Sequence, residues 1–282
     1  MHPTVTYHKV KLPLTRLNYL KCGQGKPLIM VPATISEINN WLSLVQFVGQ
    51  KYEVYFFELP GHGESTPFKS PFKSELLAET VEQFINSLGF KTVSLLGFSF
   101  GGILTLRTLF RLQDRVEKVV LMSPCVTHKA LRHSPVQIRT MKTLASLMKS
   151  NKAQSILLKL IHNEKTVDSF IWLVRKIGDV EKNSLLKEKL LRLPPSTLKV
   201  LVHQVNEILT IEFQTKDKFN HPCYFAMSVN DPLLDFSTTK NTLGNMFQNL
   251  TTKEFDFPYH QPPKPFTYEE LNNEYKELLE LI

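Results

Sequence analysis

A serine set among glycines is the residue group that most clearly points to chemistry. Gly97-Phe98-Ser99-Phe100-Gly101-Gly102 fits the pattern Gly-X-Ser-X-Gly. It follows the apolar run 93–96 and precedes a stretch over 101–112 that reads as a helix. A sharp turn from strand to helix strains the central residue and lifts its hydroxyl off the sheet, and the flanking glycines give the backbone room. The pattern predicts that Ser99 is a nucleophile, the alternative being a plain glycine-rich turn.

The helix expected after Ser99 also provides a place for negative charge. The N-terminus of a helix presents unpaired N–H groups and the positive end of its dipole. The N–H of Phe100, the residue after the nucleophile, would therefore face the oxyanion that forms when Ser99 attacks an acyl carbonyl.

Short apolar runs alternate with helix-like stretches in the first part of the chain. Short runs without polar alternation are typical of parallel strands buried on both faces, so the pattern predicts a doubly wound α/β sheet. An antiparallel opening is expected at 5–19, strands at 28–31, 54–57, 93–96 and 119–122, and helices at 41–49, 74–88 and 101–112. Ser74 is the expected N-cap of the second of these helices, and Gly89 follows its end.

After Thr127 the pattern changes to apolar residues at helical spacing. This spacing predicts four to five amphipathic helices before the next strand-like run. Strands at 224–227 and 252–257 and helices at 238–247 and 267–282 complete the chain. The expected organisation is a core at 1–126, a helical lid at 127–218 and a second part of the core at 219–282.

With these features in place, the chain resembles the α/β-hydrolase superfamily, in its serine-nucleophile branch with a helical lid (carboxylesterase- or lipase-like). The resemblance rests on the run 97–102, on Leu59-Pro60-Gly61-His62-Gly63-Glu64-Ser65 and on Trp41 in the first helix. It covers nearly the whole chain outside the insertion. It implies an α/β-hydrolase fold, a lid after the sixth strand, and a triad in the order nucleophile, acid, histidine.

A serine hydroxyl becomes nucleophilic when an imidazole takes its proton, and that imidazole needs a carboxylate partner. Among nine histidines, His260 alone follows the last apolar strand and precedes the terminal helix. Its proline-flanked loop resembles the histidine loop of the family, although an ordinary surface histidine is the alternative. Asp231, at the end of a strand, resembles the position of the family's acid. Asp235 is the competing acid, but it is better suited to cap the next helix.

The rest of the expected site comes from the same resemblance. Counting back from Trp41 places Thr34 at the position of the second oxyanion donor, with Pro32 and Ala33 where the family commonly has His and Gly. Glu58 replaces a common Asp. These departures leave the family member and its substrate open. Phe98 and Trp172 are the residues expected to line a substrate pocket.

The expected activity is hydrolysis of carboxylic esters of small to medium apolar substrates through an acyl-enzyme. Cleavage of a C–C bond, a thioester or a lactone by the same triad is the alternative, as is a slow-turnover receptor of the same fold. Ser99 at the nucleophile position argues against the epoxide hydrolase and haloalkane dehalogenase branches. No residue spacing suggests a metal site, and no cofactor is expected.

Composition limits which class of protein this can be and where in the cell it is expected. The chain has 282 residues, 42% of them hydrophobic, which is ample for a core, and only three cysteines. No apolar run reaches the length of a membrane span, and the N-terminus lacks the pattern of a secretory signal. These features favour a cytoplasmic monomer or homodimer, without stable membrane insertion, that acts on a small-molecule ester or related acyl substrate.

The net charge of +8 is concentrated in one region. Residues 127–218 hold 17 Lys and Arg against 8 Asp and Glu, a net charge of +9, so the rest of the chain is nearly neutral. Nothing in the sequence resembles a nucleic-acid recognition motif, so no nucleic-acid partner is expected. The simpler explanation is that the solvent faces of the lid helices are lysine-rich. The alternative is that the lid attracts anionic substrates or a membrane surface.

Overall fold

The fold is built on a sheet whose strands carry the apolar runs of the sequence. The computed structural model describes residues 2–178, 186–262 and 264–282. Within them the strands are β1 (Val5–Lys11), β2 (Arg16–Cys22), β3 (Lys26–Val31), β4 (Tyr52–Phe57), β5 (Val93–Phe98), β6 (Val116–Met122), β7 (Cys223–Ser228) and β8 (Leu250–Phe255). They pair in the order β1-β2-β4-β3-β5-β6-β7-β8. The pairs β1·β2 and β2·β4 are antiparallel, and the remaining pairs are parallel.

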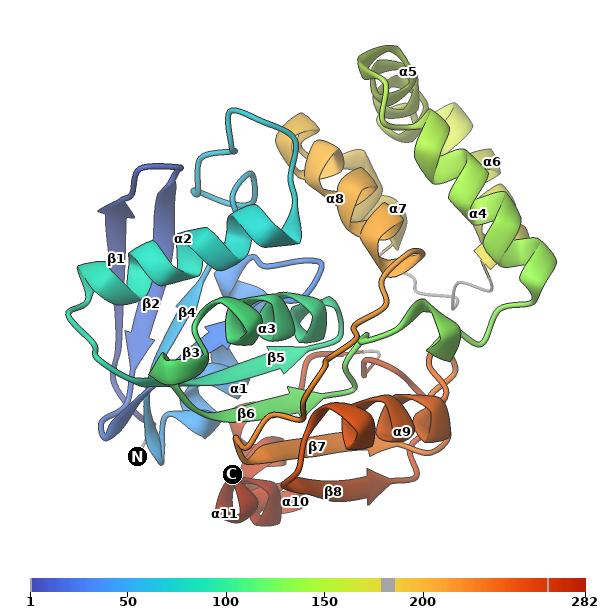
Figure 1. The fold of residues 1–282 in the computed structure, drawn as a ribbon. Coiled ribbons are helices and arrows are strands. Elements are labelled where there is room, and N and C mark those ends of the chain that lie inside the picture. The colour runs from blue at the N-terminus through green and yellow to red at the C-terminus, as the bar shows by residue number, and fades with distance from the viewer. Residues whose placement is uncertain (1, 179–185, 263) are drawn as a thin grey trace.

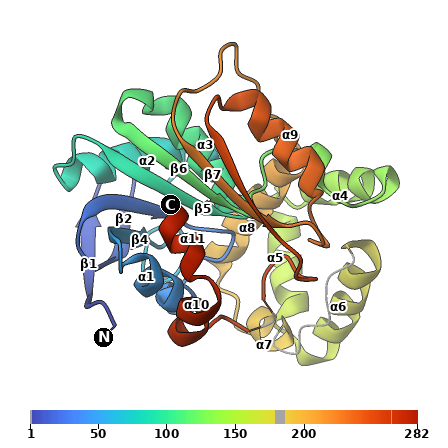
Figure 2. The ribbon, with the colours of Figure 1, turned by 90° about the horizontal axis from the view of Figure 1, so that it is seen from below.

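Helices cover both faces of this sheet, so each face has its own apolar core (Figures 1 and 2). One face carries α1 (Leu42–Val48), α10 (Tyr268–Glu274) and α11 (Lys276–Leu281). The other carries α2 (Ser74–Ser87), α3 (Phe100–Arg111) and α9 (Phe236–Met246). The central strands are buried on both sides, which explains their unbroken apolar runs. The doubly wound, mostly parallel sheet predicted from the sequence is confirmed.

Between β6 and β7 the chain leaves the sheet to form a group of helices, here called the helical insertion (Figure 1). Its described helices are α4 (Pro135–Leu147), α5 (Asn151–Ile161), α6 (Glu164–Gly178), α7 (Leu186–Leu191) and α8 (Pro195–Ile208). Residues 179–185 of the lid expected at 127–218 lie outside the described residues. The Thr197 hydroxyl on α8 donates a hydrogen bond of 3.1 Å to the Gly61 carbonyl. This bond attaches α8 to the core.

One predicted helix cap is wrong. Ser74 is the first helical residue of α2 rather than its N-cap, which is Lys73. The Ser74 N–H donates to the Glu207 carboxylate of α8 at 2.8 Å, and its hydroxyl accepts from the Arg107 guanidinium at 3.3 Å. A carboxylate from a distant helix therefore accepts a hydrogen bond from a free N–H at the start of α2, a role that a local N-cap side chain usually has.

The end of the chain also differs from the prediction. Instead of one helix over 267–282, α10 ends at Glu274 and α11 begins at Lys276, with Tyr275 between them at φ −121° and ψ 17°. The last strand is β8 at 250–255, two residues before the predicted start and end. The chain that follows β8 is therefore an irregular segment, and it carries His260.

Candidate active site

Ser99 sits at the turn between β5 and α3 in a strained conformation. Its φ of 52° and ψ of −118° lie outside the regions that non-glycine residues prefer. A Cβ on Gly97 would come within 2.3 Å of the Thr105 hydroxyl, and one on Gly101 within 2.7 Å of the Val31 carbonyl. Only glycine fits at either position, because a Cβ atom would overlap with these oxygen atoms. The Gly-X-Ser-X-Gly spacing thus allows the close packing that holds Ser99 in place.

Ser99, His260 and Asp231 form a continuous hydrogen-bonded chain. His260 Nε2 lies 2.8 Å from Ser99 Oγ, and His260 Nδ1 lies 2.7 Å from Asp231 Oδ2. The side chain of Asp231 is fully buried and that of His260 is 10% exposed. The other carboxylate oxygen of Asp231 accepts the N–H groups of Leu233 and Leu234 at 2.8 and 3.0 Å. The structure therefore brings together the three side chains that the sequence suggested, although 161 residues separate Ser99 from His260.

Two polar residues at the end of β7 tie the acid loop to the histidine loop. The Ser228 hydroxyl donates to the Phe257 carbonyl at 2.6 Å, and the Asn230 amide donates to the Asp256 carbonyl at 3.0 Å. Neither residue was expected from the sequence to have a role. Their position just before Asp231, where a buried apolar strand ends, is the signal that was available.

Asp235 has a different set of partners. It is the N-cap of α9, where its carboxylate accepts the Thr238 N–H at 2.8 Å and the Thr238 hydroxyl at 2.6 Å. These hydrogen bonds lower the pKa of Asp235. Arg132 lies 3.6 Å from the same carboxylate. The structure thus assigns Asp235 a capping role and places Asp231 beside the histidine.

The chain between β3 and α1, which carries Thr34, passes directly over the start of α3. A Cβ on Gly101 would lie only 2.7 Å from the Val31 carbonyl oxygen and 2.9 Å from that of Pro32. Phe100, the first residue of α3, is completely buried. Backbone N–H groups in the first turn of a helix have no partner within it. Thr34 and Phe100 therefore belong to two segments that meet beside Ser99.

Glu58 and His62 are buried beside the chain between β3 and α1. The buried Glu58 carboxylate accepts hydrogen bonds from the Ile38 N–H at 3.3 Å, the Glu64 N–H at 2.7 Å and the Asn18 amide at 3.0 Å. His62 is 1% exposed, and its ring nitrogens have no hydrogen-bond partner among the described residues. Burial lowers the pKa of His62 to about 4, a shift that the nearby backbone of Thr34 partly opposes.

This buried imidazole predicts a particular loss of stability in acid. His62 binds a proton near pH 6.5 when the chain is unfolded but only near pH 4 when it is folded. Its contribution is complete above pH 6.5 and is lost as the pH falls towards 4, because the unfolded state then binds more protons. We expect the free energy of unfolding to drop by about 3 kcal/mol more in the wild type than in His62→Gln between about pH 7 and pH 4. Urea unfolding at several pH values measures this difference. If the free energy of unfolding changed equally with pH in the two proteins, the prediction would be contradicted.

The two residues expected to line a substrate pocket are placed differently. Phe98 lies between Trp41 and His260, with a ring-centroid distance of 5.6 Å to each. Trp172 on α6 is 63% exposed. Among the α6 residues up to 173, whose exposure the structure describes, Val167 and Ile171 are buried, so Trp172 lies on another side of the helix. The structure brings Phe98 to the site and leaves Trp172 on the surface.

Three further features of the described residues concern metal ligands, cysteines and membrane-spanning helices. They contain no group of three or more His, Cys, Asp or Glu side chains placed to hold a metal ion. All three cysteines are buried and free, and burial raises the pKa of Cys125 to about 12. In the same part of the chain, no helix has both the length and the apolar character of a membrane span.

An eight-stranded, mostly parallel sheet that holds a serine, a histidine and an aspartate in hydrogen-bond contact beyond its strands defines the α/β-hydrolase fold class. Residues 26–154 match the family described as alpha/beta hydrolase fold. This match and the fold together support the α/β-hydrolase superfamily that the sequence suggested.

Individual relatives are distant and have different activities. The chain is similar to a soluble epoxide hydrolase of Corynebacterium sp. (strain C12), with 22% identity over 122 residues, or 43% of each chain. It is 30% identical over 104 residues to a pimeloyl-[acyl-carrier protein] methyl ester esterase of Nitrosospira multiformis, covering 36% of this chain and 39% of the relative. The chain thus spans less than half the length of these curated relatives. A thermophilic esterase from Thermogutta terrifontis matches over 98% of both chains at a TM-score of 0.66 and 17% identity.

Proposed function

We propose that this protein is a serine hydrolase that cleaves carboxylic esters of small to medium apolar substrates through an acyl-enzyme. The observation that carries the proposal is the hydrogen-bonded chain from Ser99 through His260 to the buried Asp231. This is the arrangement that activates a hydroxyl: the imidazole accepts its proton, and the carboxylate holds the ring and stabilises its charged form.

The geometry supports a two-stage reaction. Ser99 Oγ attacks the ester carbonyl while its proton moves to His260 Nε2, 2.8 Å away. The negative oxygen that forms would be held by the N–H groups of Phe100 and Thr34, each worth about 3 kcal/mol of transition-state stabilisation. His260 then passes the proton to the departing alcohol, which leaves an ester on Ser99. A water molecule, deprotonated by the same imidazole, cleaves that ester and restores the serine.

The nucleophile favours acyl substrates over epoxides, although a matched relative is an epoxide hydrolase. A serine that opened an epoxide would become an ether, which water does not readily cleave. A serine that attacks an acyl carbon becomes an ester, which the activated water can hydrolyse. Thioesters, lactones and the C–C bond next to a ketone pass through the same acyl-enzyme, so they are the alternative substrates of this site.

The proposal is tested with p-nitrophenyl esters whose acyl chains range from acetyl to octanoyl. We expect steady turnover of short and medium chains, and labelling of Ser99 by a fluorophosphonate, located by mass spectrometry. The turnover curve also separates an enzyme from a receptor of the same fold. A burst of p-nitrophenol followed by a stall would favour a slow-turnover receptor, and no release with any ester would refute the ester proposal.

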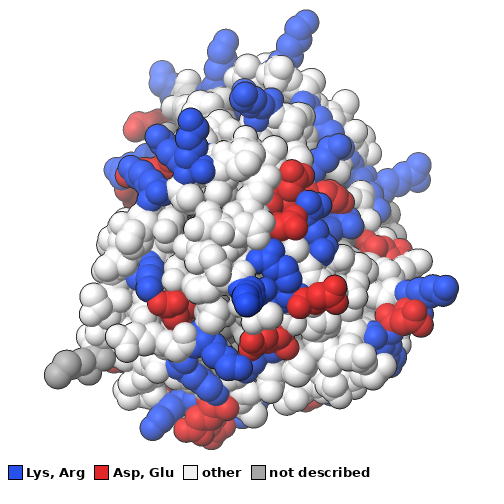
Figure 3. All heavy atoms as spheres, turned by 60° about the vertical axis from the view of Figure 1, so that its left-hand side comes forward, with Lys and Arg blue, Asp and Glu red and all other residues white. Residues whose placement is uncertain are grey.

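The charge of the helical insertion gives a further expectation about substrates. Lys and Arg outnumber Asp and Glu at the top of Figure 3, where the helices of the insertion lie. A surface of one sign attracts substrates of the other sign, and salt screens that attraction. We expect kcat/KM for an anionic ester to fall roughly tenfold between about 0.01 M and 0.5 M salt, with little change for a neutral ester of the same acyl group.

A charge-reversal variant provides the matched comparison. Lys152 and Lys159 are exposed on α5, whereas Lys26 is exposed at the start of β3 in the core. Replacing either α5 lysine with glutamate should weaken the salt dependence more than Lys26→Glu does. The same salt dependence for the anionic and the neutral ester would show that the charge serves only to solvate the helices.

A further inference from the structure

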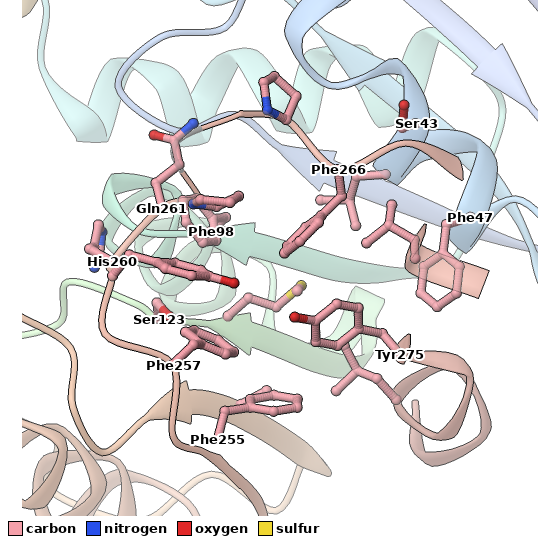
Figure 4. A pocket seen from close by; sticks show the side chains of 18 of the residues that line it. Ser43, Phe47, Phe98, Ser123, Phe255, Phe257, His260, Gln261, Phe266 and Tyr275 are labelled. Carbon is pink, nitrogen blue, oxygen red and sulfur yellow. The ribbon is translucent and has the colours of Figure 1, made fainter. Parts of the chain in front are cut away.

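An apolar cavity lies behind the imidazole of His260, on the face of the sheet that carries α1, α10 and α11 (Figure 4). Its volume is about 120 Å³. Phe98 and Met122 from the sheet, Phe257 and Phe266 from the chain after β8, and Tyr275 between the last two helices line it. Ser99 is not among its lining residues. The imidazole nitrogens of His260 are hydrogen-bonded to Ser99 and Asp231, so the rest of the ring is left to face the cavity.

A continuous run of aromatic rings forms much of the wall. Tyr259 stacks on Phe257 at a centroid distance of 4.7 Å, and Phe257 stacks on Phe255 at 5.2 Å. Phe255 then contacts Tyr275 at 5.7 Å, and Tyr275 contacts Phe266 at 5.2 Å. The break between α10 and α11 falls at Tyr275. The loop after β8 that carries His260, and the break in the last helix that the sequence did not indicate, are therefore the elements that build this wall.

The size and lining of the cavity indicate what it can hold. Protein interiors are close-packed and have few voids larger than a water molecule, and an empty void lowers stability. The Tyr275 hydroxyl points into the cavity (Figure 4), but most of the wall is apolar, so it offers few of the two to four polar partners that a water molecule needs. A dry cavity of about 150 Å³ lined by Leu, Ile and Phe is known to bind benzene. Aromatic edges and faces also favour a flat or alkyl guest in van der Waals contact.

We propose that this cavity is a binding site for an uncharged apolar group of about the size of a benzene ring. The group is either a free small hydrocarbon or aromatic molecule, or the apolar end of the substrate itself. Because His260 and Phe98 form part of the wall, with ring centroids 5.6 Å apart, a guest contacts the back of the imidazole that holds Ser99. Occupation of the cavity then stiffens the histidine loop.

Binding is tested directly with fluorobenzene, followed by ¹⁹F NMR. Saturable binding to the wild type is expected. Ala226→Leu fills the cavity from β7 and Leu271→Phe fills it from α10, since both positions line it. Each should weaken binding about tenfold or more by occupying the space of the guest. Ala153→Leu, the same kind of change on α5 in the helical insertion, should leave binding unchanged.

The fold of each filled variant is checked by its thermal unfolding midpoint, and either variant suffices for the comparison. Non-saturable binding to the wild type, or equal affinity in the wild type and in a folded, filled variant, overturns the proposal. This arm does not depend on catalysis, so it gives its result even if the protein hydrolyses no ester.

A second arm, which rests on the proposed ester hydrolysis, identifies the source of the guest. If the acyl tail of the substrate enters the cavity, fluorobenzene competes with a p-nitrophenyl hexanoate but not with the acetate. If the cavity takes a separate molecule, fluorobenzene changes kcat/KM of both esters by the same factor. Both outcomes support the binding site, and they distinguish its two occupants.

Discussion

Replacing Ser99 with alanine is expected to lower kcat for p-nitrophenyl ester hydrolysis by about 10⁵- to 10⁶-fold. In the proposed mechanism the Ser99 oxygen forms the acyl-enzyme, and the hydrogen bonds of His260 to the described residues reach no other nucleophile. The donors expected from Thr34 and Phe100 remain in the variant, so a residual rate above that of water is expected. Steady-state rates and loss of fluorophosphonate labelling measure the effect.

Ser94 provides the matched control for this substitution. It lies five residues earlier, on the strand β5 that leads to Ser99, and is buried, and its hydroxyl has no hydrogen-bond partner among the described residues. Ser94→Ala should therefore retain nearly full activity, because it removes a hydroxyl that contributes no bond. Equal activity in Ser99→Ala and the wild type would refute the mechanism, whatever the control shows.

Replacing Asp231 with asparagine should lower kcat by about 10⁴-fold while leaving the fold intact. The carboxylate accepts from His260 Nδ1 at 2.7 Å, which leaves Nε2 free to accept the serine proton. An amide in its place can donate to Nδ1 and so favour the wrong tautomer. It also cannot stabilise the imidazolium that forms during attack. The loss should appear in kcat at saturating substrate, with circular dichroism unchanged.

Asp235→Asn separates the two aspartates that the sequence offered. Asparagine is about as good an N-cap as aspartate, so this variant should keep both the helix and the activity, within about tenfold of the wild type. A greater loss of kcat in Asp235→Asn than in Asp231→Asn would reverse the assignment of the acid.

Most of the sheet could be predicted because the residue types of its strands reflect their burial directly. Runs such as 28–31 and 119–122 are apolar at every position, since both faces of those strands are buried. Helix ends depend on distant partners and were harder to predict. At the start of α2 the Ser74 N–H is bonded to the Glu207 carboxylate, 133 residues away, and nothing in the sequence near Ser74 indicates this partner.

The candidate triad was predictable for a related reason: its side chains follow strands, two of them buried, and lie in turns or loops whose sequences are distinctive. Ser99 follows β5, Asp231 follows β7, and His260 lies in the chain after β8. The surroundings of the site were less predictable, because exposure depends on packing between helices. Trp172 illustrates this, since its sequence suggested a pocket residue and the structure leaves it 63% exposed.

The position of the helical insertion has a consequence for dissecting the molecule. Ser99 precedes the insertion, whereas Asp231 and His260 follow it. A single cut within the insertion would therefore yield two polypeptides, neither of which holds a complete set of reacting groups. The cut would also separate β6 from β7, neighbours in the sheet that pair along their edges. If the proposed ester hydrolysis is the activity, its rate would then report the reassociation of the two halves, so this chain could serve as a split-enzyme sensor of any interaction that brings them together.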